Sequence, residues 1–469
     1  MSVSDSLDPL FRPKSIVLIG AARSEEKLGG IILKNLLRYR GVIYPVNPKY
    51  NELMGIKAYP SVKAVSELSE VSSAKVNLAI IIRPASEVPG ILRELHQCTK
   101  TAIIVSSGFS EVGQAGLQDE VKNIGKETGI RLLGPNCLGV YNAHKRLDTL
   151  FISREKLERP KKGNVAVLSQ SGAVMSCLFE AIRSSNTGIS KAVGYGNAVD
   201  IGESDFYDYL AGDPHTDIVI SYLESLGDGR KFIKAAKALS DKKTLLVLKS
   251  GKGFSGQAAA FSHTGRLAGR YEIFNSILRQ FGIKEAVDFE DLVDSAKALS
   301  YQKPARPHEA EGHAKGPRFL GRARVCIVTN GGGSGVLAVD ECMRQMLDVV
   351  QVSQEKAKKL KDVFPPFYPM NNPIDLTVQV KDTDYAAVLD MLKDDYDGFV
   401  VIALTAATGV TAALAGLIID FKERSGKPVV LYTDASRAAR SMTALFERAG
   451  IPAYPSPERA VRGLKALLV

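Results

Sequence analysis

The sequence predicts an α/β protein made of doubly wound, mostly parallel sheets. Short apolar, β-branched runs alternate with amphipathic helical patterns along most of the chain, which is the pattern of strands covered by helices on both faces. The chain of 469 residues is too long for one hydrophobic core, so we expect about two to four domains. A strand, a turn of small residues and a helix also recur in that order at two places, which indicates repeated units.

The first block of the chain opens with a buried strand and the amphipathic helix GGIILKNLLRYR (29–40). A further helix, within LQDEVKNIGKETG, precedes the last strand of this block. Because helices separate the strands, we expect them to be parallel. The strands expected here are SIVLIG (15–20), VIYPVN (42–47), VNLAIII (76–82), AIIVSS (102–107) and IRLLGPN (130–136).

Two more blocks repeat this alternation. The second starts at NVAVLSQSG (164–172) and the third at VCIVTNGGGSG (325–335). Between them lies a polar stretch with proline and glycine and no periodicity, which is typical of a linker; its His308 and His313 are therefore expected to be linker residues. The later strands expected are ISKAVGYG (189–196), DIVISYLES (217–225), TLLVLKSG (244–251), FVVIALT (399–405) and PVVLYT (428–433). We therefore expect domains at 1–145, 146–300 and 323–469, with a linker at 301–322.

Composition excludes several classes of protein. The net charge is +10, but Lys and Arg are spread along the chain, so we expect anionic small ligands rather than nucleic acid. The longest apolar run, at 76–82, is too short to span a membrane, and the N-terminus lacks the pattern of a signal peptide. The five cysteines are scattered, which favours a reducing cytoplasm and no metal site.

The second and third blocks open with matching turns. NVAVLSQSG places Gln170, Ser171 and Gly172 between a strand and a helix, and NGGGSG places Gly333, Ser334 and Gly335 likewise. Each turn would direct the free N–H groups of a helix start out of the carboxyl edge of a sheet. Any α/β unit needs small residues at this corner, but two matched turns suggest that two helix N-termini hold one anion.

The first block is expected to bind a ligand rich in phosphate. After its first strand, GAARSEEKLGG (20–30) provides Gly20 and the glycines that open the next helix, without the GxGxxG pattern of NAD enzymes. Those enzymes also place an acid after the second strand, whereas this chain has Pro48 and Lys49 there. A nicotinamide-dependent oxidoreductase is therefore disfavoured, and Arg23 and Lys49 suit coenzyme A with its 3′-phosphate.

The stretch SHTGRLAG (262–269) holds one of only six histidines. From the residues alone, His263 could be a surface residue, a general base, a metal ligand or a covalent carrier. Metal ligation is the weakest of these, because no cluster of Cys and His accompanies it.

Several motifs together resemble the ADP-forming acyl-CoA synthetases of the succinyl-CoA synthetase superfamily. The resemblance covers essentially the whole chain, in order, and implies an N-terminal Rossmann-like CoA-binding domain followed by two flavodoxin-like domains. The full family enzyme also has a two-part ATP-grasp, so the resemblance implies that this chain is the α subunit of an α2β2 assembly, with ADP, ATP and Mg²⁺ mainly on a separate ATP-grasp β subunit. The motifs are YPVNPK, GPNCLGVYN (134–142), SQSG (169–172), GYGN (194–197), YLES (222–225), SHTGRLAG, NGGGSG (330–335) and NNPIDL (371–376).

The resemblance also implies roles for single residues. His263 matches the phosphohistidine, and Glu224 matches the glutamate that orients its imidazole. The two matched turns correspond to the helix starts that hold the phosphate. Cys137 is expected to be a contact residue near the thiol, and Arg266 departs from the family's usual small residue. The residues that match the CoA site are Gly20, Lys27, Pro48, Lys49, Pro84, Ser107 and Asn136.

These assignments imply the reaction acyl-CoA + ADP + phosphate ⇌ acid + ATP + CoA, through an acyl phosphate and a phosphohistidine, with acetate as the expected acid. The imidazole is partly neutral near neutral pH and is a good nucleophile toward an activated phosphoryl group. The alternative is a regulatory protein of the same fold that binds CoA or acyl-CoA without catalysis.

Overall fold

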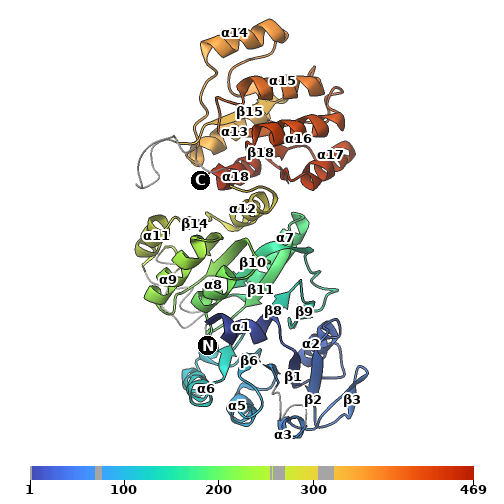
Figure 1. Ribbon diagram of the computed structural model, residues 1–469, viewed down its shortest axis with the longest axis vertical. Helices are drawn as coiled ribbons and strands as arrows, with labels where there is room; N and C mark the ends of the chain where they lie inside the picture. Colours follow the sequence, from blue (N-terminus) through green and yellow to red (C-terminus); the bar gives the residue numbers. More distant parts are fainter. Residues whose placement is uncertain (1–2, 69–75, 254–255, 257–269, 305–321, 469) are drawn as a thin grey trace. The chain divides into compact units, whose positions relative to one another are not determined.

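The computed structural model describes residues 3–68, 76–253, 256, 270–304 and 322–468. The chain divides into two compact units, Met1–Val287 and Asp288–Val469, and Figure 1 labels their elements. Among the described residues, unit 1 holds a five-stranded sheet, a seven-stranded sheet and a two-stranded hairpin, and unit 2 holds a five-stranded sheet. In each of the three larger sheets, parallel strands alternate along the chain with helices. The α/β, doubly wound fold class is therefore confirmed.

The first sheet of unit 1 is parallel throughout. Its strands are β1 (Ser15–Ile19), β2 (Val42–Val46), β5 (Leu78–Ile81), β6 (Thr101–Ile104) and β7 (Arg131–Leu133), in the order β2-β1-β5-β6-β7. Around them lie the helices α2 (Leu28–Leu36), α3 (Val62–Ser66), α5 (Val88–Leu95) and α6 (Ala115–Thr128), the turns η1 (Ala85–Glu87) and η2 (Ser110–Val112), and the hairpin β3 (Glu52–Leu53) and β4 (Ile56–Lys57). From β1 the chain goes to β2 on one side and then to β5 on the other, so the loops after β1 and β5 diverge.

The strands of this sheet were predicted from apolar runs because helices cover both faces. Every residue of β5 and β6 is buried, so the runs show no polar alternation. Helix α2 ends at Leu36, earlier than its pattern predicted. The amide of Tyr39 bonds instead to the carbonyl of Leu36 at 2.8 Å, which closes a tighter turn before the next strand.

The second sheet of unit 1 has a parallel part and an antiparallel edge. Parallel strands run in the order β14-β13-β12-β10-β11; β8 then pairs antiparallel with β11, and β9 pairs antiparallel with β8. The strands are β8 (Gly139–Asn142), β9 (Leu147–Asp148), β10 (Lys162–Ser169), β11 (Ile189–Gly194), β12 (Ile218–Leu223), β13 (Thr244–Lys249) and β14 (Lys284–Glu285). The helices are α1 (Val3–Phe11), α7 (Gly172–Ser184), α8 (Glu203–Ala211), α9 (Gly229–Ser240) and α11 (Tyr271–Gln280).

The chain crosses from the first sheet to the second within GPNCLGVYN (134–142). This stretch leaves β7 and enters β8, which pairs with β11 from Gly139↔Gly194 onward. Strands β8 and β9 were not predicted from the sequence, because a short antiparallel pair takes its stability from the sheet that it joins. The crossing makes the two sheets of unit 1 neighbours.

A backbone seam strengthens this crossing. Three amides of residues 197–201 donate to carbonyls of residues 132–135 at N···O distances of 3.0 to 3.1 Å. Gly196 permits the approach, because its φ is +57° and a Cβ there would lie 2.1 Å from the carbonyl oxygen of Asn136. Close backbone packing therefore requires the second glycine of the GYGN motif, Gly196.

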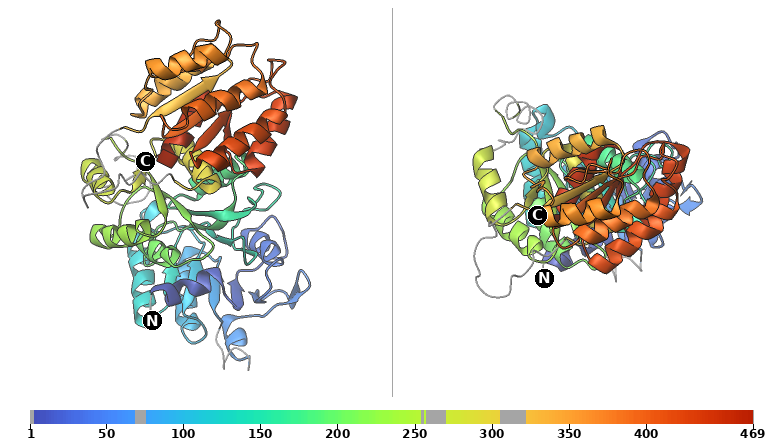
Figure 2. Two further views of the ribbon diagram at one scale, coloured as in Figure 1. Left: turned by 45° about the horizontal axis from the view of Figure 1, so that its top comes forward. Right: turned by 90° about the horizontal axis from the view of Figure 1, so that it is seen from above.

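Unit 2 contains one parallel sheet, in the order β16-β15-β17-β18-β19. Its strands are β15 (Val325–Thr329), β16 (Ile374–Asp375), β17 (Gly398–Ile402), β18 (Val429–Tyr432) and β19 (Ala453–Tyr454). Its helices are α12 (Phe289–Tyr301), α13 (Gly332–Arg344), α14 (Gln354–Val363), α15 (Asp382–Leu392), α16 (Ala413–Ser425), α17 (Arg437–Arg448) and α18 (Pro457–Leu468). Figure 2 shows helices of this unit, drawn in orange and red, on both sides of its strands.

Helix α12 belongs to unit 2 although it precedes the expected linker. Its Asp294 forms an ion pair with Arg459 of α18 at 2.7 Å, and its Lys297 donates to the carbonyl of Ala453 at 2.5 Å. These two polar contacts join α12 to β19 and α18, the last strand and the last helix of the chain.

The seam gives a testable prediction about Gly196. Gly196→Ala should destabilise unit 1 by about 1–3 kcal/mol or more, because it combines a left-handed backbone with a backbone clash, and the thermal midpoint should fall. Gly212→Ala is the matched control, since the nearest atom to its added Cβ lies 3.8 Å away and its φ is −99°. An unchanged midpoint for Gly196→Ala would contradict the seam.

Candidate active site at the carboxyl edge of the second sheet

The second sheet has a topological switch point between β10 and β12. From β10 the chain goes to β11 on one side and then to β12 on the other. The loops that follow β10 and β12 therefore diverge, and ligands of doubly wound sheets bind at such a point. Gln170 and Ser171 follow β10, and Glu224 and Ser225 follow β12, so residues 54 positions apart in the chain meet at this edge.

The side-chain amide of Gln170 joins the loop after β10 to the loop after β12. Its Nε2 donates to the carbonyl of Ser225 at 2.8 Å, and its Oε1 accepts from the amide of Ser225 at 2.9 Å and from the amide of Glu224. Gln170 is buried, so these bonds form away from water and fix the backbone that carries Glu224.

Lys249 holds the same backbone from the other side. It ends β13, the neighbour of β12, and its Nζ donates to the carbonyl of Glu224 at 2.7 Å and to that of Ser250. Glu224 and Lys249 are only 6% and 3% exposed. The peptide groups of Glu224 are thus bound on both sides by buried side chains from neighbouring strands.

The charges at this edge influence one another. Burial lowers the pKa of Lys249 to about 8, although the negative charges of Glu224 and Glu285 oppose that shift. Burial also raises the pKa of Tyr222, and the nearby Glu224 carboxylate adds to that effect. This edge of the sheet therefore contains a buried lysine, Lys249, and a buried glutamate, Glu224, in one low-dielectric environment.

Helix α7 points its N-terminus into this edge. Ser171 caps the helix, and its Oγ accepts from the amide of Val174 at 3.3 Å. The Oγ of Ser169 donates to the carbonyl of Ser171 at 2.6 Å, which fixes the turn. The free N–H groups and the dipole of such a helix start favour an anion.

The crossing segment brings the first sheet to this helix start. A Cβ added to Gly172 would lie 3.5 Å from Cβ of Leu138, within the crossing segment. Cys137, its neighbour, is buried, and its Sγ donates to the carbonyl of Ile104 at 3.2 Å. Burial raises the pKa of Cys137 to about 12, so this thiol packs rather than reacts near neutral pH.

The residues predicted to bind CoA lie along the carboxyl edge of the first sheet. They occupy the loops that follow each of its five parallel strands, so the topology gathers them at one edge. Most of them are exposed. By strand they are Gly20, Arg23 and Lys27 after β1, Pro48 and Lys49 after β2, Pro84 after β5, Ser107 after β6, and Asn136 after β7.

Local geometry shapes two of these loops. A Cβ added to Gly29, in the first turn of α2, would lie 2.0 Å from the carbonyl oxygen of Gly20, so only glycine lets the helix start approach the turn after β1. Asn47 donates from Nδ2 to the carbonyl of Ala21 at 2.7 Å and accepts from the amide of Lys49 at 2.8 Å. Asn47 thereby fixes the backbone that carries Lys49.

Asn136 links the two edges of unit 1. Its φ is +55°, and its Nδ2 donates to Oδ1 of Asn197 at 3.4 Å. Asn197 in turn donates to Glu111 at 2.6 Å, in the loop that follows β6. The proposed CoA edge and the second sheet are therefore hydrogen-bonded to each other.

The second predicted turn lies in unit 2, at the start of α13. Asn330 exchanges two hydrogen bonds with the backbone of Leu404, at 2.9 and 2.8 Å, which fixes the loop after β15 against the loop after β17. Gly333 has open space where a Cβ would lie, and Ser334 is partly exposed. Gly335 is buried against β15 and Pro373.

His263 and Arg266 lie outside the described residues, as do His308 and His313. The structure adds one residue to this edge that the sequence analysis missed, Lys249. Its signal was a single basic residue at the end of the apolar strand TLLVLKSG, which alone cannot be distinguished from a solvated strand end.

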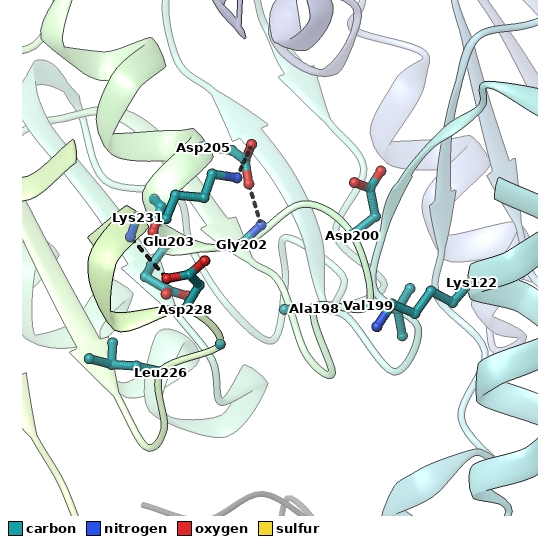
Figure 3. Close-up of a pocket in the computed structure, with 12 residues that line it drawn as sticks. Lys122, Ala198, Val199, Asp200, Gly202, Glu203, Asp205, Leu226, Asp228 and Lys231 are labelled. Carbon is teal, nitrogen blue, oxygen red and sulfur yellow. Dashed lines mark hydrogen bonds and ion pairs between the residues drawn. The ribbon is translucent and has the colours of Figure 1, made fainter. Parts of the chain in front are cut away.

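A pocket of about 510 Å³ opens beside this edge. It lies between the loops that follow β11 and β12, with Lys122 of α6 on the opposite side (Figure 3). Its carboxylates serve the fold: Asp205 accepts from Lys231 at 2.9 Å and from the amide of Gly202 at 3.1 Å, and Asp228 caps α9.

Two further findings concern the described part of the chain. Its His, Cys, Asp and Glu side chains form no group of three or more that could hold a metal ion. Within the same ranges, no helix combines the length and apolar character needed to cross a membrane.

Three family models match the chain in succession. They are described as a CoA binding domain, at residues 14–143, a succinyl-CoA ligase like flavodoxin domain, at residues 162–299, and a Ligase-CoA domain, at residues 325–464. The matches follow the order of the three sheets.

Similar proteins cover almost the whole chain. The α subunit of acetate–CoA ligase [ADP-forming] II from Pyrococcus furiosus is 34% identical over 98% of this chain and 97% of its own length. Acetate–CoA ligase [ADP-forming] I from Archaeoglobus fulgidus is 34% identical over 98% of this chain. This chain spans only 63% of that relative's length.

A solved structure is similar over the same extent. It is the dinucleotide forming acetyl-coenzyme A synthetase 1 of Ca. Korarchaeum cryptofilum, in complex with phosphate and ADP. It superposes with a TM-score of 0.84 at 34% identity, covering 98% of this chain and 96% of the matched chain.

The Gln170 contacts predict a local effect of substitution. Gln170→Leu should leave two buried amides and one carbonyl without partners, at about 1–3 kcal/mol for each lost partner. Hydrogen exchange measured by mass spectrometry should accelerate in peptides that cover residues 222–228. Gln114→Leu, at an exposed helix start with no side-chain cap, should leave that exchange unchanged; equal exchange in the two variants would contradict the role of Gln170.

Proposed function

The chain belongs to the ADP-forming acyl-CoA synthetases, and from this premise we propose that it is the α subunit of an ADP-forming acetate–CoA ligase. One support for this proposal is the Pyrococcus α subunit, which this chain matches along nearly its whole length. We propose three domains at 1–145, 146–300 and 323–469, joined before the last by a linker at 301–322; helix α12, at the end of the second range, packs within unit 2. The regulatory alternative has less support, because the similar proteins described above are named as ligases or synthetases.

We propose that a separate ATP-grasp β subunit completes the enzyme as α2β2. Two observations support a missing part: the name of the Pyrococcus relative as a subunit, and the longer chain of the Archaeoglobus relative. ADP and Mg²⁺ would bind mainly to that partner. Cytoplasmic location fits the five cysteines, all of which are free.

The observation that carries the proposal is the fixed position of Glu224 beside the start of α7. Its backbone is bound by Gln170 and Lys249, so the main chain from which its carboxylate extends is fixed. A carboxylate that accepts a hydrogen bond from one ring nitrogen of His263 would fix the tautomer of the imidazole and stabilise the charge that develops on it. The helix start, with Gln170, Ser171 and Gly172, would hold the phosphoryl group.

The reaction balances in three steps. Phosphate oxygen attacks the thioester carbonyl of acetyl-CoA, giving acetyl phosphate and the thiol of CoA. A ring nitrogen of His263 then attacks phosphorus, the P–O bond to acetate breaks, and phosphohistidine forms. A terminal oxygen of ADP takes the phosphoryl group to give ATP and free His263. Gly333, Ser334 and Gly335 of unit 2 are proposed to provide the second helix start for the phosphate.

CoA is proposed to lie along the carboxyl edge of the first sheet, in contact with Gly20, Arg23, Lys27, Pro48, Lys49, Pro84, Ser107 and Asn136. The support is the gathering of these loops at one edge and the CoA binding domain match at residues 14–143. The hydrogen bond from Asn136 to Asn197 and the approach of Leu138 to Gly172 give a short route from this edge to the start of α7.

The phosphohistidine step predicts labelling of this chain. With the ATP-grasp partner and radiolabelled ATP, the chain should acquire acid-labile, base-stable phosphate. His263→Ala should abolish the label, and Glu224→Gln should slow its formation at least ~100-fold, the scale of a lost general acid–base partner.

A matched control for this test is Glu25→Gln, whose carboxylate pairs with Lys34 at 2.7 Å on the surface of the first sheet domain. Its labelling should equal that of the wild type. Label that persists in His263→Ala would overturn the assignment of His263, and a wild-type rate in Glu224→Gln would remove Glu224 from the mechanism.

The position of Lys49 predicts selectivity for the 3′-phosphate of CoA. Lys49→Ala should raise the KM for CoA about tenfold, equivalent to ~1.4 kcal/mol, and should leave the KM for 3′-dephospho-CoA nearly unchanged. Lys57→Ala, in the β3–β4 hairpin, is the control and should change neither. Equal effects of Lys49→Ala on the two thiols would place the 3′-phosphate elsewhere.

A further inference from the structure

Lys249 is a buried charged group to which the reaction above gives no role. It ends β13 beside Glu224, and both acceptors of its ammonium are main-chain carbonyl oxygens, those of Glu224 and Ser250. The amide of Glu224 is bound by Gln170 from β10. In the order β13-β12-β10, the residue after β12 is thus held by one side chain from each neighbouring strand.

The charged surroundings of Lys249 come from three elements. The charges that act on it are those of Glu224 after β12, Glu285 of β14, and Lys252 from the segment after β13. Glu285 is engaged by other groups, because Lys252 lies 2.9 Å from it and Asn275 donates to it at 2.9 Å. Of these two acidic residues, Glu224 is the one whose backbone carbonyl accepts a hydrogen bond from Lys249.

A lysine in this position does not serve stability well. Carbonyl oxygens replace only part of the hydration that a buried ammonium loses, so burial disfavours the charged form. An apolar residue at the end of β13 would fit the rest of the strand, in which Leu245 to Leu248 are all apolar and buried. A charge kept where the local pattern calls for an apolar residue is a mark of a functional position.

We propose that Lys249 is a positioning residue for phosphoryl transfer, which holds Glu224 through its carbonyl oxygen and provides positive charge at the edge where the phosphoryl group is handled. This inference rests on the proposed function and deepens it. A cation in a low-dielectric crevice acts on an anion more strongly than one at the surface, and here the fold fixes it before the phosphoryl group arrives. The helix starts and the positive charge of Lys249 would then stabilise the phosphoryl group together.

The test measures the initial rate of phosphohistidine formation by the full chain with its ATP-grasp partner and labelled ATP, from about pH 6 to about pH 10. Lys249→Met should lower the rate at least about tenfold at neutral pH. The wild-type rate should fall as the pH rises through about 8, where Lys249 loses its proton. Lys249→Arg keeps its charge throughout this range, so its rate should not fall there.

Lys252→Met is the matched control, since this nearby lysine pairs with Glu285 at 2.9 Å. It should keep the wild-type rate at neutral pH and move the alkaline decline to higher pH, because the charge of Lys252 lowers the pKa of Lys249. Thermal melts separate a structural role: equal midpoints for Lys249→Met and wild type with a slower rate support the proposal. A wild-type rate in Lys249→Met, or an alkaline decline that persists unchanged in Lys249→Arg, would overturn it. Should Lys249→Met fail to fold, the Lys249→Arg profile alone decides. A wild type that takes no label would refute the proposed function instead.

Discussion

The structure of the candidate site depends on how one residue at a strand end is held. Glu224 follows β12, which lies between β10 and β13, and its two peptide groups are bound by Gln170 on one side and Lys249 on the other. Parallel sheets make this arrangement possible, because the carboxyl ends of neighbouring strands lie at the same edge. The main chain that carries the Glu224 carboxylate is therefore fixed from both neighbouring strands of the sheet.

The same edge is coupled to the first sheet by the chain itself. The segment 134–142 ends one sheet and begins the antiparallel edge of the next, so the loop of Asn136 and the start of α7 belong to one compact unit. The proposed CoA contacts of the first sheet and the proposed phosphate contacts of the second therefore belong to one compact unit. Effective concentration between two bound groups depends on rigidity, because each loosely held degree of freedom reduces the fraction of productive arrangements.

Much of the fold could be predicted from the sequence, and the reasons are physical. Runs such as VNLAIII identify strands because helices bury both faces of the sheet, and the glycine turns mark where strands become helices. The gathering of loops at one edge follows from parallel strands alone, so the proximity of Gln170 to Glu224 was within reach of the sequence. Strands β8 and β9 were not, since their pairing depends on β11, a partner distant in the chain.

Lys249 shows a different limit of sequence reasoning. A lysine at the end of an apolar run is usually solvated, and only the packing of β12, β13 and β14 makes this one buried. Burial is a property of the assembled sheet, and no local pattern carries it. The cost of that burial is visible in the lowered pKa of Lys249, a quantity that the amino-acid order does not contain.

The seam between residues 132–135 and 197–201 has a consequence for how this protein can change over time. Its bonds join backbone to backbone, so their strength is independent of most side chains along them. Substitutions in either loop can alter the surface presented to a ligand while the two sheets stay in register, provided that the seam glycines are kept. Besides Gly196, these include Gly134, whose φ is +97° and where a Cβ would lie 2.5 Å from the carbonyl oxygen of Ile104. These two positions tolerate little change over time, whereas the side chains around them are free to diversify.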